Sequence, residues 1–213
     1  MKKCVIYIHG KGGTASEAEH YKPLFKGFDV IGFDYQAQTP WEAKAEFADF
    51  FAEVVAKYEQ ISLVANSIGA FFALHSFNDK EISEAFFVSP IVNMEHLIEN
   101  MMNWAGVSEE ELQEKGIIQT EFGETLSWEY LSWVRNNQIN WCFPTHILYA
   151  SRDNLQSLED IEDFAAKIGA DVTVMNGGEH WFHTSEQLQF LDDWIVKKKL
   201  INFTDTSARN TIG

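Results

Sequence analysis

A serine lies between two apolar runs in the stretch Ile61-Ser62-Leu63-Val64-Ala65-Asn66-Ser67-Ile68-Gly69-Ala70-Phe71-Phe72-Ala73-Leu74. The first run is short and rich in β-branched residues, as in a buried strand, and the second is typical of a helix. A serine between small residues at a sharp strand-to-helix turn is the pattern of a nucleophile elbow. Ala65 and Gly69 leave room for the two backbones to pass close together. Ser67 is therefore a candidate nucleophile.

The pattern by itself also fits an ordinary serine at the N-cap of a helix, because serine is a preferred N-cap residue. The two interpretations differ in what they require elsewhere in the chain. A nucleophile needs a base, a carboxylate and donors for an oxyanion, each at the end of another strand.

Length and charge limit the classes of function. The chain has 213 residues, of which 46% are hydrophobic, so it can bury the core of a single domain. It carries 16 basic and 32 acidic side chains, a net charge of −16. That charge repels phosphate backbones and anionic lipid, so we expect neither a nucleic acid nor a membrane as partner. The acidity fits a well-solvated surface.

The sequence favours a cytoplasmic location. The apolar run after Met1-Lys2-Lys3 stops at His9-Gly10, which is shorter than the core of a signal peptide, so we expect no export. No stretch approaches the length of a membrane span. Two cysteines, Cys4 and Cys142, make no disulfide framework, and we expect both to be buried in a reducing compartment.

Short apolar runs alternate with helical patterns along the chain. The predicted strands are Cys4–Ile8, Val30–Phe33, Ile61–Ala65, Ala85–Ser89, Thr145–Ala150 and Val172–Met175. The predicted helices are Ser16–Lys26, Trp41–Tyr58, Ile68–Phe77, Leu155–Ile168 and Ser185–Lys199. This alternation predicts an α/β fold, a three-layer sandwich in which helices cover both faces of a mostly parallel sheet of about six strands.

One interval interrupts the alternation. Residues 94–140 contain no convincing strand and several short helical patterns, which predicts a helical cap or lid inserted into the fold. Residues 1–93 and 141–201 then form the core. The polar segment 202–213 has no pattern, and we predict a flexible tail.

Three further segments follow predicted strands. His9-Gly10-Lys11-Gly12-Gly13 follows the first strand, and its glycines allow a backbone amide to turn toward the next elements, which is what an oxyanion donor needs. Asp153 follows the fifth strand and His180 follows the sixth. Because parallel strands bring their loops to one edge, Ser67, Asp153 and His180 should converge.

With nucleophile, acid and histidine in this order, the chain from Cys4 to about Lys199 resembles the α/β-hydrolase superfamily of serine hydrolases. The resemblance implies a sheet in which the six strands follow the spatial order second, first, third, fourth, fifth and sixth. It also implies that residues 94–140 stand where the family commonly inserts its lid. Ala65 departs from the commoner glycine of the family motif, and it still satisfies the steric demand.

Carried over residue by residue, the resemblance implies that Ser67 is the nucleophile and His180 the general base. Asp153 would orient His180 and stabilise its protonated form. The backbone amides of Ile68 and Lys11 would form the oxyanion hole. The resemblance implies no cofactor.

Other residues compete for these roles. His183 is an alternative base, although it lies directly before a helix cap, whereas His180 lies in a glycine-preceded loop. Alternative acids are Asp34, Asp160 and Asp163. His9 more naturally braces the turn that it begins. No histidine pair has the spacing and third ligand of a metal site, so we expect no metal.

The predicted cap supplies apolar and aromatic side chains that could line an acyl pocket or simply attach the cap to the sheet. The candidates for substrate contact are Met101, Trp104, Trp128 and Trp133. Residues 94–140 carry nine acidic and two basic side chains, a net charge of −7, which disfavours polyanionic substrates. A neutral or cationic small ester fits this charge.

We therefore predict a serine hydrolase that cleaves a small carboxylic ester through an acyl-enzyme, of the carboxylesterase type. The same three residues would serve a thioesterase, lactonase, amidase or aminopeptidase. A ligand-binding protein that keeps the fold without turnover is the alternative of another class. The expected partner is a small-molecule ester, and the sequence specifies no oligomeric state.

Overall fold

A single parallel sheet forms the centre of the molecule. The computed structural model describes residues 2–77 and 82–209. The strands of this sheet are β1 (Lys3–Ile8), β2 (Asp29–Phe33), β3 (Gln60–Asn66), β4 (Glu84–Val88), β7 (Thr145–Ala150) and β8 (Asp171–Met175). Their order is β2-β1-β3-β4-β7-β8, and every neighbouring pair is parallel. The predicted fold class and strand order are confirmed.

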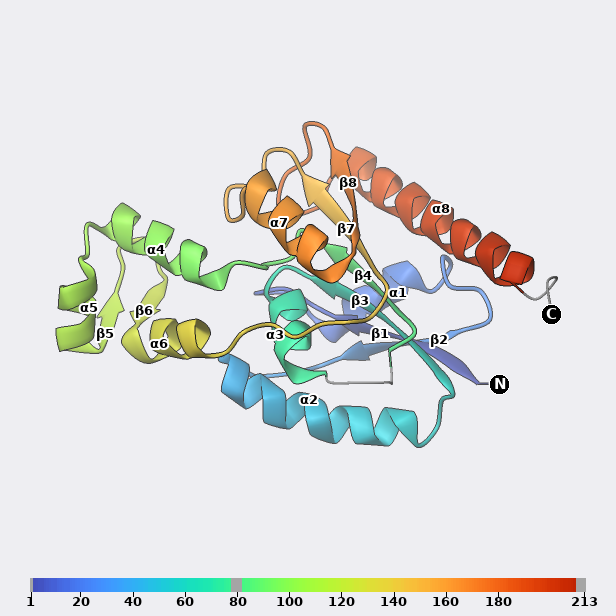
Figure 1. The fold of residues 1–213 in the computed structure, drawn as a ribbon, viewed down its shortest axis with the longest axis horizontal. Coiled ribbons are helices and arrows are strands. Elements are labelled where there is room, and N and C mark those ends of the chain that lie inside the picture. The colour runs from blue at the N-terminus through green and yellow to red at the C-terminus, as the bar shows by residue number, and fades with distance from the viewer. Residues whose placement is uncertain (1, 78–81, 210–213) are drawn as a thin grey trace.

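Helices cover both faces of the sheet (Figure 1). They are the 3₁₀ turn η1 (Ala15–Glu17), α1 (Ala18–Tyr21), α2 (Pro40–Val55), α3 (Ile68–Ser76), α7 (Leu158–Ile168) and α8 (Ser185–Arg209). The alternation of β1 defines two cores: Ile6 and Ile8 face α2, α3 and α7, whereas Val5 and Tyr7 face α1 and α8. Because both faces of β1 are covered, all four side chains are fully buried.

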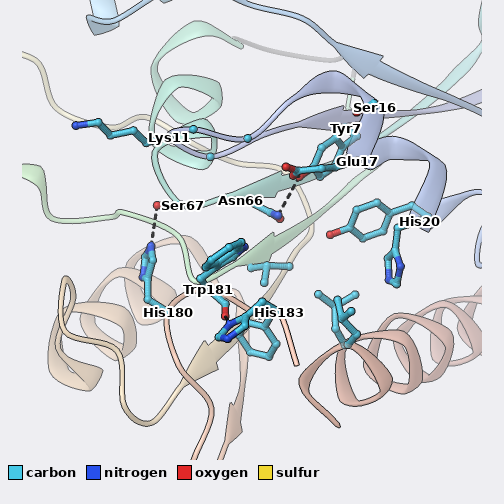
Figure 2. A pocket seen from close by; sticks show the side chains of 18 of the residues that line it. Tyr7, Lys11, Ser16, Glu17, His20, Asn66, Ser67, His180, Trp181 and His183 are labelled. Atoms are coloured by element: carbon cyan, nitrogen blue, oxygen red, sulfur yellow. Dashed lines mark hydrogen bonds between the residues drawn. The ribbon is translucent and has the colours of Figure 1, made fainter. Parts of the chain in front are cut away.

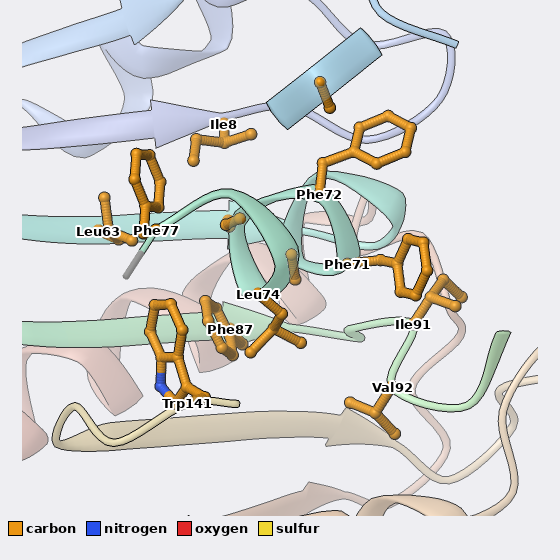
Figure 3. Packing of buried hydrophobic residues seen from close by; sticks show 14 of the residues in the cluster. Ile8, Leu63, Phe71, Phe72, Leu74, Phe77, Phe87, Ile91, Val92 and Trp141 are labelled. Atoms are coloured by element: carbon orange, nitrogen blue, oxygen red, sulfur yellow. The ribbon is translucent and has the colours of Figure 1, made fainter. Parts of the chain in front are cut away.

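Helix α3 lies inside the larger core, where its side chains pack between strands and the segment after β4 (Figure 3). Six consecutive residues from Gly69 to Leu74 are buried, so this helix shows no polar face. Each large side chain that is buried there contributes roughly 1.5–3 kcal/mol to folding. A helix buried on all sides holds its first turn rigidly, and Ser67 directly precedes that turn.

The segment between β4 and β7 extends away from the sheet (Figure 1). It contains α4 (Met94–Ala105), α5 (Glu109–Lys115), β5 (Ile117–Gln119), β6 (Thr125–Ser127) and α6 (Trp128–Asn136). The antiparallel pair β5–β6 corrects the prediction of helices alone. Strands of three residues are too short to show a period in the sequence. The division into core and cap stays a prediction.

Ion pairs connect the helices of the cap. The Arg135 guanidinium on α6 binds Glu95 and Glu99 of α4 and Glu109 of α5, at 2.6, 3.3 and 2.6 Å. One arginine thus joins three helices, which its planar fork of donors allows.

Three local predictions were wrong. The predicted helix 16–26 ends at Tyr21, two residues before Pro23, because proline has no N–H for a helical hydrogen bond and its ring clashes with the preceding turn. The predicted helix 185–199 continues as α8 to Arg209, into the segment predicted as a flexible tail, because no proline or glycine interrupts it. Residues 210–213 of that tail lie outside the described residues. Cys142 is exposed, although Cys4 is buried as predicted. Within the described chain, no helix is long and apolar enough to cross a membrane.

The first turn of α3 touches the end of β1. A Cβ atom added at Gly69 would lie 2.3 Å from the carbonyl oxygen of His9 and 2.9 Å from that of Ile8. Both neighbours are backbone atoms of a buried strand, so neither can move aside. Only glycine allows this contact, which is the steric requirement inferred for the turn.

We expect Gly69→Ala to destabilise the protein by about 2 kcal/mol, because the added methyl group forces α3 away from β1. Helix propensity alone would make the same change stabilising by about 1 kcal/mol. The sign of the change in the free energy of unfolding therefore separates the two effects. Urea unfolding of both proteins measures it. A variant as stable as the wild type would show that the close contact is not required.

His75 gives the fold a pH dependence. Its ring packs edge-on against Phe71 and Trp133, with centroids at 4.6 and 4.9 Å. Burial, with a smaller effect of the positive charge on Lys44, lowers the pKa of His75 to about 4. The unfolded chain, with an ordinary histidine pKa, binds the proton first as the pH falls below about 6.5.

We expect this histidine to cost up to about 3 kcal/mol of stability between pH 6.5 and pH 4. His75→Gln should reduce the loss of unfolding free energy over that interval, measured by urea denaturation at both pH values. The matched control is His183→Gln, which changes an exposed histidine. If the unfolding free energy of His75→Gln falls as much as that of the wild type between the two pH values, His75 is not the cause of the pH dependence.

Candidate active site

Ser67 lies in a strained turn between β3 and α3. Its backbone φ is 51° and its ψ is −122°, a conformation that a residue with a side chain rarely adopts. Such strain costs on the order of 1–3 kcal/mol and persists only where neighbours enforce it. Here the Ser67 N–H donates to the Val88 carbonyl at 3.1 Å, and the Ile91 N–H donates to the Ser67 carbonyl at 3.2 Å. Strand β4 and the residues after it therefore hold the turn.

The glycine-rich turn after β1 passes directly against Ser67. A Cβ atom at Gly10 would lie 3.2 Å from the Cβ of Ser67, and the Gly13 N–H closes the turn on the Gly10 carbonyl at 3.1 Å. Lys11 follows Gly10 in this turn. On the other side, Ile68 is the first residue of α3, so its N–H has no acceptor within the helix. The Ile68 amide therefore adjoins Ser67 at a helix N-terminus, which favours negative charge, and the Lys11 amide lies in the turn that passes against Ser67.

A chain of hydrogen bonds joins three side chains from three loops. The Ser67 Oγ lies 2.8 Å from His180 Nε2, and His180 Nδ1 lies 2.6 Å from Asp153 Oδ2 (Figure 2 draws the first bond). The Asp153 side chain is fully buried, and that of His180 is 15% exposed. With Nδ1 protonated toward the carboxylate, Nε2 can accept a proton from the serine hydroxyl.

The backbone fixes the direction of the Asp153 carboxylate. Its Oδ1 accepts the N–H groups of Leu155 and Gln156 at 2.8 and 3.2 Å, which leaves Oδ2 for His180. Because both oxygens have donors, the buried charge is stabilised without a cation.

The loops after β7 and β8 are hydrogen-bonded to each other. The Arg152 N–H donates to the Gly178 carbonyl at 2.9 Å, and the Gly177 N–H donates to Ser151 Oγ at 2.8 Å. Gly177 has a φ of +76°, which lets this loop turn back toward β7. These bonds bring His180 to Asp153, which lies 27 residues earlier in the chain.

The competing residues do not join this chain of hydrogen bonds. The His183 ring is directed to the Trp181 carbonyl, and the Asp160 carboxylate binds Asn93 and His96. Asp34 and Asp163 are exposed. His9 packs its ring on Tyr35 at 4.3 Å and turns Nδ1 to the Gly10 carbonyl at 2.9 Å, which fits a bracing role.

A cavity of about 800 Å³ opens beside Ser67 and His180. Its walls come from the end of β1 and the turn after it, from η1 and α1, from the end of β3, and from residues 180–191 (Figure 2). Lys11 lines it next to Ser67. Its size lies within the range of pockets that bind small molecules.

The predicted substrate contacts are not in this cavity. None of the four cap residues lines it: Met101, Trp104, Trp128 and Trp133. Trp133 packs on His75 and Trp41 instead, and Trp104 packs on Phe122 while 55% exposed. The contacts of Trp133 agree with the alternative that the aromatic residues attach the cap to the rest of the protein, because a cap must bury an apolar face to stay in place.

Among the residues of the cavity wall that sequence reasoning missed are Tyr7, Glu17, Asn66 and Trp181. Two had signals in the sequence. Trp181 directly follows His180, and Glu17 comes three residues after Thr14, the spacing of a capping box, which the structure forms at the start of η1. The other two are recognisable only once the sheet is assembled. In residues 2–77 and 82–209, no three or more metal-binding side chains are grouped around one point.

Comparison with known proteins gives structural matches only. No family model and no curated protein sequence matches the chain. Mouse alpha/beta hydrolase domain-containing protein 10 is similar in structure, with a TM-score of 0.74, 17% identity, and coverage of 94% of this chain and 90% of that one. Est1E from Butyrivibrio proteoclasticus has a TM-score of 0.73, 15% identity, and coverage of 96% and 90%. The Pyrococcus furiosus esterase Pf2001 has a TM-score of 0.60, 19% identity, and coverage of 93% and 80%. The chain has the fold of the α/β-hydrolase superfamily.

Proposed function

We propose that this protein is a serine hydrolase that cleaves small carboxylic esters through an acyl-enzyme. The observation that carries the proposal is the hydrogen-bonded chain from Ser67 through His180 to Asp153, at 2.8 and 2.6 Å, beside a cavity. Two of the structurally similar proteins are named as esterases or hydrolases. An ordinary helix-capping serine would need no strained φ and no histidine at its hydroxyl.

In the first half of the reaction, Ser67 Oγ attacks the ester carbonyl carbon as His180 Nε2 takes the hydroxyl proton. The carbonyl oxygen becomes negative, and the amides of Ile68 and Lys11 donate to it. When the tetrahedral intermediate collapses, the C–O bond to the alcohol breaks and His180 gives its proton to the departing oxygen. The acyl group is then esterified to Ser67.

In the second half, a water molecule attacks the acyl carbon, and its proton passes to His180 Nε2. The bond to Ser67 Oγ breaks as His180 returns the proton to that oxygen, and a carboxylic acid leaves. In both halves Asp153 stabilises the imidazolium, since its buried carboxylate is held by two backbone N–H groups on the opposite oxygen.

A small substrate fits the site. The cavity beside Ser67 is about 800 Å³ and combines apolar side chains such as Val88 and Leu155 with a few polar groups. The net charge of −16 opposes binding of polyanionic esters. We therefore favour neutral or cationic esters with a modest acyl group over acyl phosphates or coenzyme thioesters.

We expect the folded protein to react with a fluorophosphonate probe at Ser67, because the probe needs a serine deprotonated by its histidine. Ser67→Ala should abolish labelling and lower the hydrolysis of 4-nitrophenyl butanoate by a factor on the order of 10³ or more. Gel fluorescence and a colorimetric assay measure these effects.

The matched control is Ser16→Ala, which removes a second serine from the same cavity wall, one that bonds only to Thr14. Labelling of this variant should equal that of the wild type. If the intact folded protein takes no label, the hydrolase proposal fails and the alternative of a non-catalytic binding protein is favoured.

We expect Asp153→Asn to lower kcat by roughly 10³–10⁴-fold without unfolding the protein. The asparagine carbonyl would accept the two N–H groups that Oδ1 now accepts, so its NH₂ would face His180 Nδ1. His180 would then carry its proton on Nε2 and could not accept the serine proton. Steady-state kinetics with 4-nitrophenyl butanoate test this. If kcat of Asp153→Asn equals that of the wild type, Asp153 has no role in the mechanism.

A further inference from the structure

A carboxylate stands in the wall of the cavity that contains Ser67. Glu17, in η1, accepts hydrogen bonds from the Tyr7 hydroxyl and from the Thr14 N–H, the latter at 3.2 Å. Its two oxygens also pack against Gly13, where an added Cβ would lie 3.0 and 3.2 Å from them. Burial raises the pKa of Tyr7, so the phenol keeps its proton and acts as the donor. The carboxylate is therefore held in one place.

The carboxylate is connected to the reacting serine through two hydrogen bonds. Asn66 directly precedes Ser67 and donates its Nδ2 to the Tyr7 oxygen at 3.1 Å, and Tyr7 donates to Glu17. Figure 2 shows Asn66 between Ser67 and the pair Tyr7 and Glu17. A substrate whose carbonyl lies at Ser67 can thus reach Glu17 within one cavity.

The basic and imidazole side chains of that wall each have a partner of opposite charge, whereas Glu17 has none among the described residues. Lys11 pairs with Glu124, and His20 pairs with Asp192 at 2.7 Å. His180 and His183 likewise face carboxylates of their own, Asp153 and Glu179. Among the residues that the structure describes, no cationic side chain pairs with Glu17. The cavity therefore has an anionic position that the protein itself does not neutralise.

A cation in the ligand would complete this arrangement. A carboxylate attracts a nearby cation, and Glu17, although exposed to solvent, is one of the residues that line the cavity. The wall also contains Trp181, which is 75% exposed, and the face of an exposed indole attracts organic cations. The acidic surface adds a long-range attraction of the same sign.

We propose that Glu17 makes the enzyme selective for esters that carry an organic cation, an ammonium or trimethylammonium group, over uncharged esters of the same shape. This inference rests on the proposed esterase function and names the substrate class of that site. A residue that only braced the glycine-rich turn would affect charged and uncharged esters alike.

Two matched ester pairs test the proposal. In the acyl pair, 4-nitrophenyl γ-trimethylammonio-butanoate is compared with its isostere in which carbon replaces the nitrogen. In the alcohol pair, butanoylcholine is compared with 3,3-dimethylbutyl butanoate. The measured quantity is the ratio of kcat/KM for the cationic ester to that for its uncharged isostere. We expect this ratio to fall by about three- to tenfold in Glu17→Gln for at least one pair.

Glutamine keeps the shape of the side chain and an acceptor oxygen for Tyr7, while its NH₂ replaces the oxygen that accepts from the Thr14 N–H. Structural effects common to both esters of a pair cancel in the ratio, so the ratio reports the charge. Glu19→Gln is the matched control: it removes an equal charge two residues away, from a side chain outside the cavity that pairs with Lys22. Its ratio should equal that of the wild type. A ratio unchanged in Glu17→Gln, or lowered equally in Glu19→Gln, overturns the proposal.

Binding to Ser67→Ala separates this inference from the proposed function. We expect pentyltrimethylammonium to raise the Tm of Ser67→Ala more than that of the double variant Ser67→Ala, Glu17→Gln. If the wild type hydrolyses no ester but the two variants still differ in their Tm shift, the proposed esterase function is refuted and the cation site stands. Hydrolysis of uncharged esters with no difference in Tm and no charge selectivity would refute the cation site alone.

Discussion

The contact between the first turn of α3 and the end of β1 is the constraint on which the site depends. Gly69 allows the helix to approach within a distance at which any Cβ would strike the His9 carbonyl. That approach places Ser67 in a positive-φ turn and brings the Gly10 turn against it. The candidate nucleophile and the two candidate oxyanion amides are thus positioned by backbone packing, and the buried core around α3 supplies the free energy that the strain costs.

The other two side chains of the hydrogen-bonded chain, His180 and Asp153, depend on a different kind of contact. His180 and Asp153 stand on loops, which are the least rigid parts of an α/β fold. Backbone hydrogen bonds between the loops after β7 and β8, together with the two N–H donors to Asp153, replace the rigidity that a helix or strand would supply. The proposed mechanism uses this rigidity, since proton transfer requires a fixed distance between Ser67 and His180.

Charge organises the molecule at two scales. The overall excess of acidic side chains opposes anionic ligands, while the cap uses Arg135 to hold three of its own glutamates together. Within the cavity, carboxylate partners are present for every cationic or imidazole side chain in the described part of the wall, and Glu17 remains without a cation. In the proposed function, Glu17 influences the choice of substrate because its charge acts within the cavity that also contains Ser67.

Much of the architecture was predictable from the sequence because it is local. Short β-branched runs predict the strands, and glycines in the sequence mark the turns that contain His9, Ser67 and His180. The α/β fold followed from the alternation of strands and helices, whereas the strand order came from the resemblance to the superfamily, and the structure has both. Predictions failed where the signal was shorter than a period, as in β5 and β6, or where no residue stops a helix, as beyond Lys199.

The sequence by itself therefore determined the fold and nominated the three side chains that the structure brings into hydrogen-bond contact. Tertiary structure alone decided which surfaces surround them. The cavity is lined by Glu17, Tyr7 and Trp181 rather than by the cap tryptophans, because a wall is made of residues far apart in the chain. Periodicity describes neighbours along the chain, whereas a pocket depends on how the layers pack against each other.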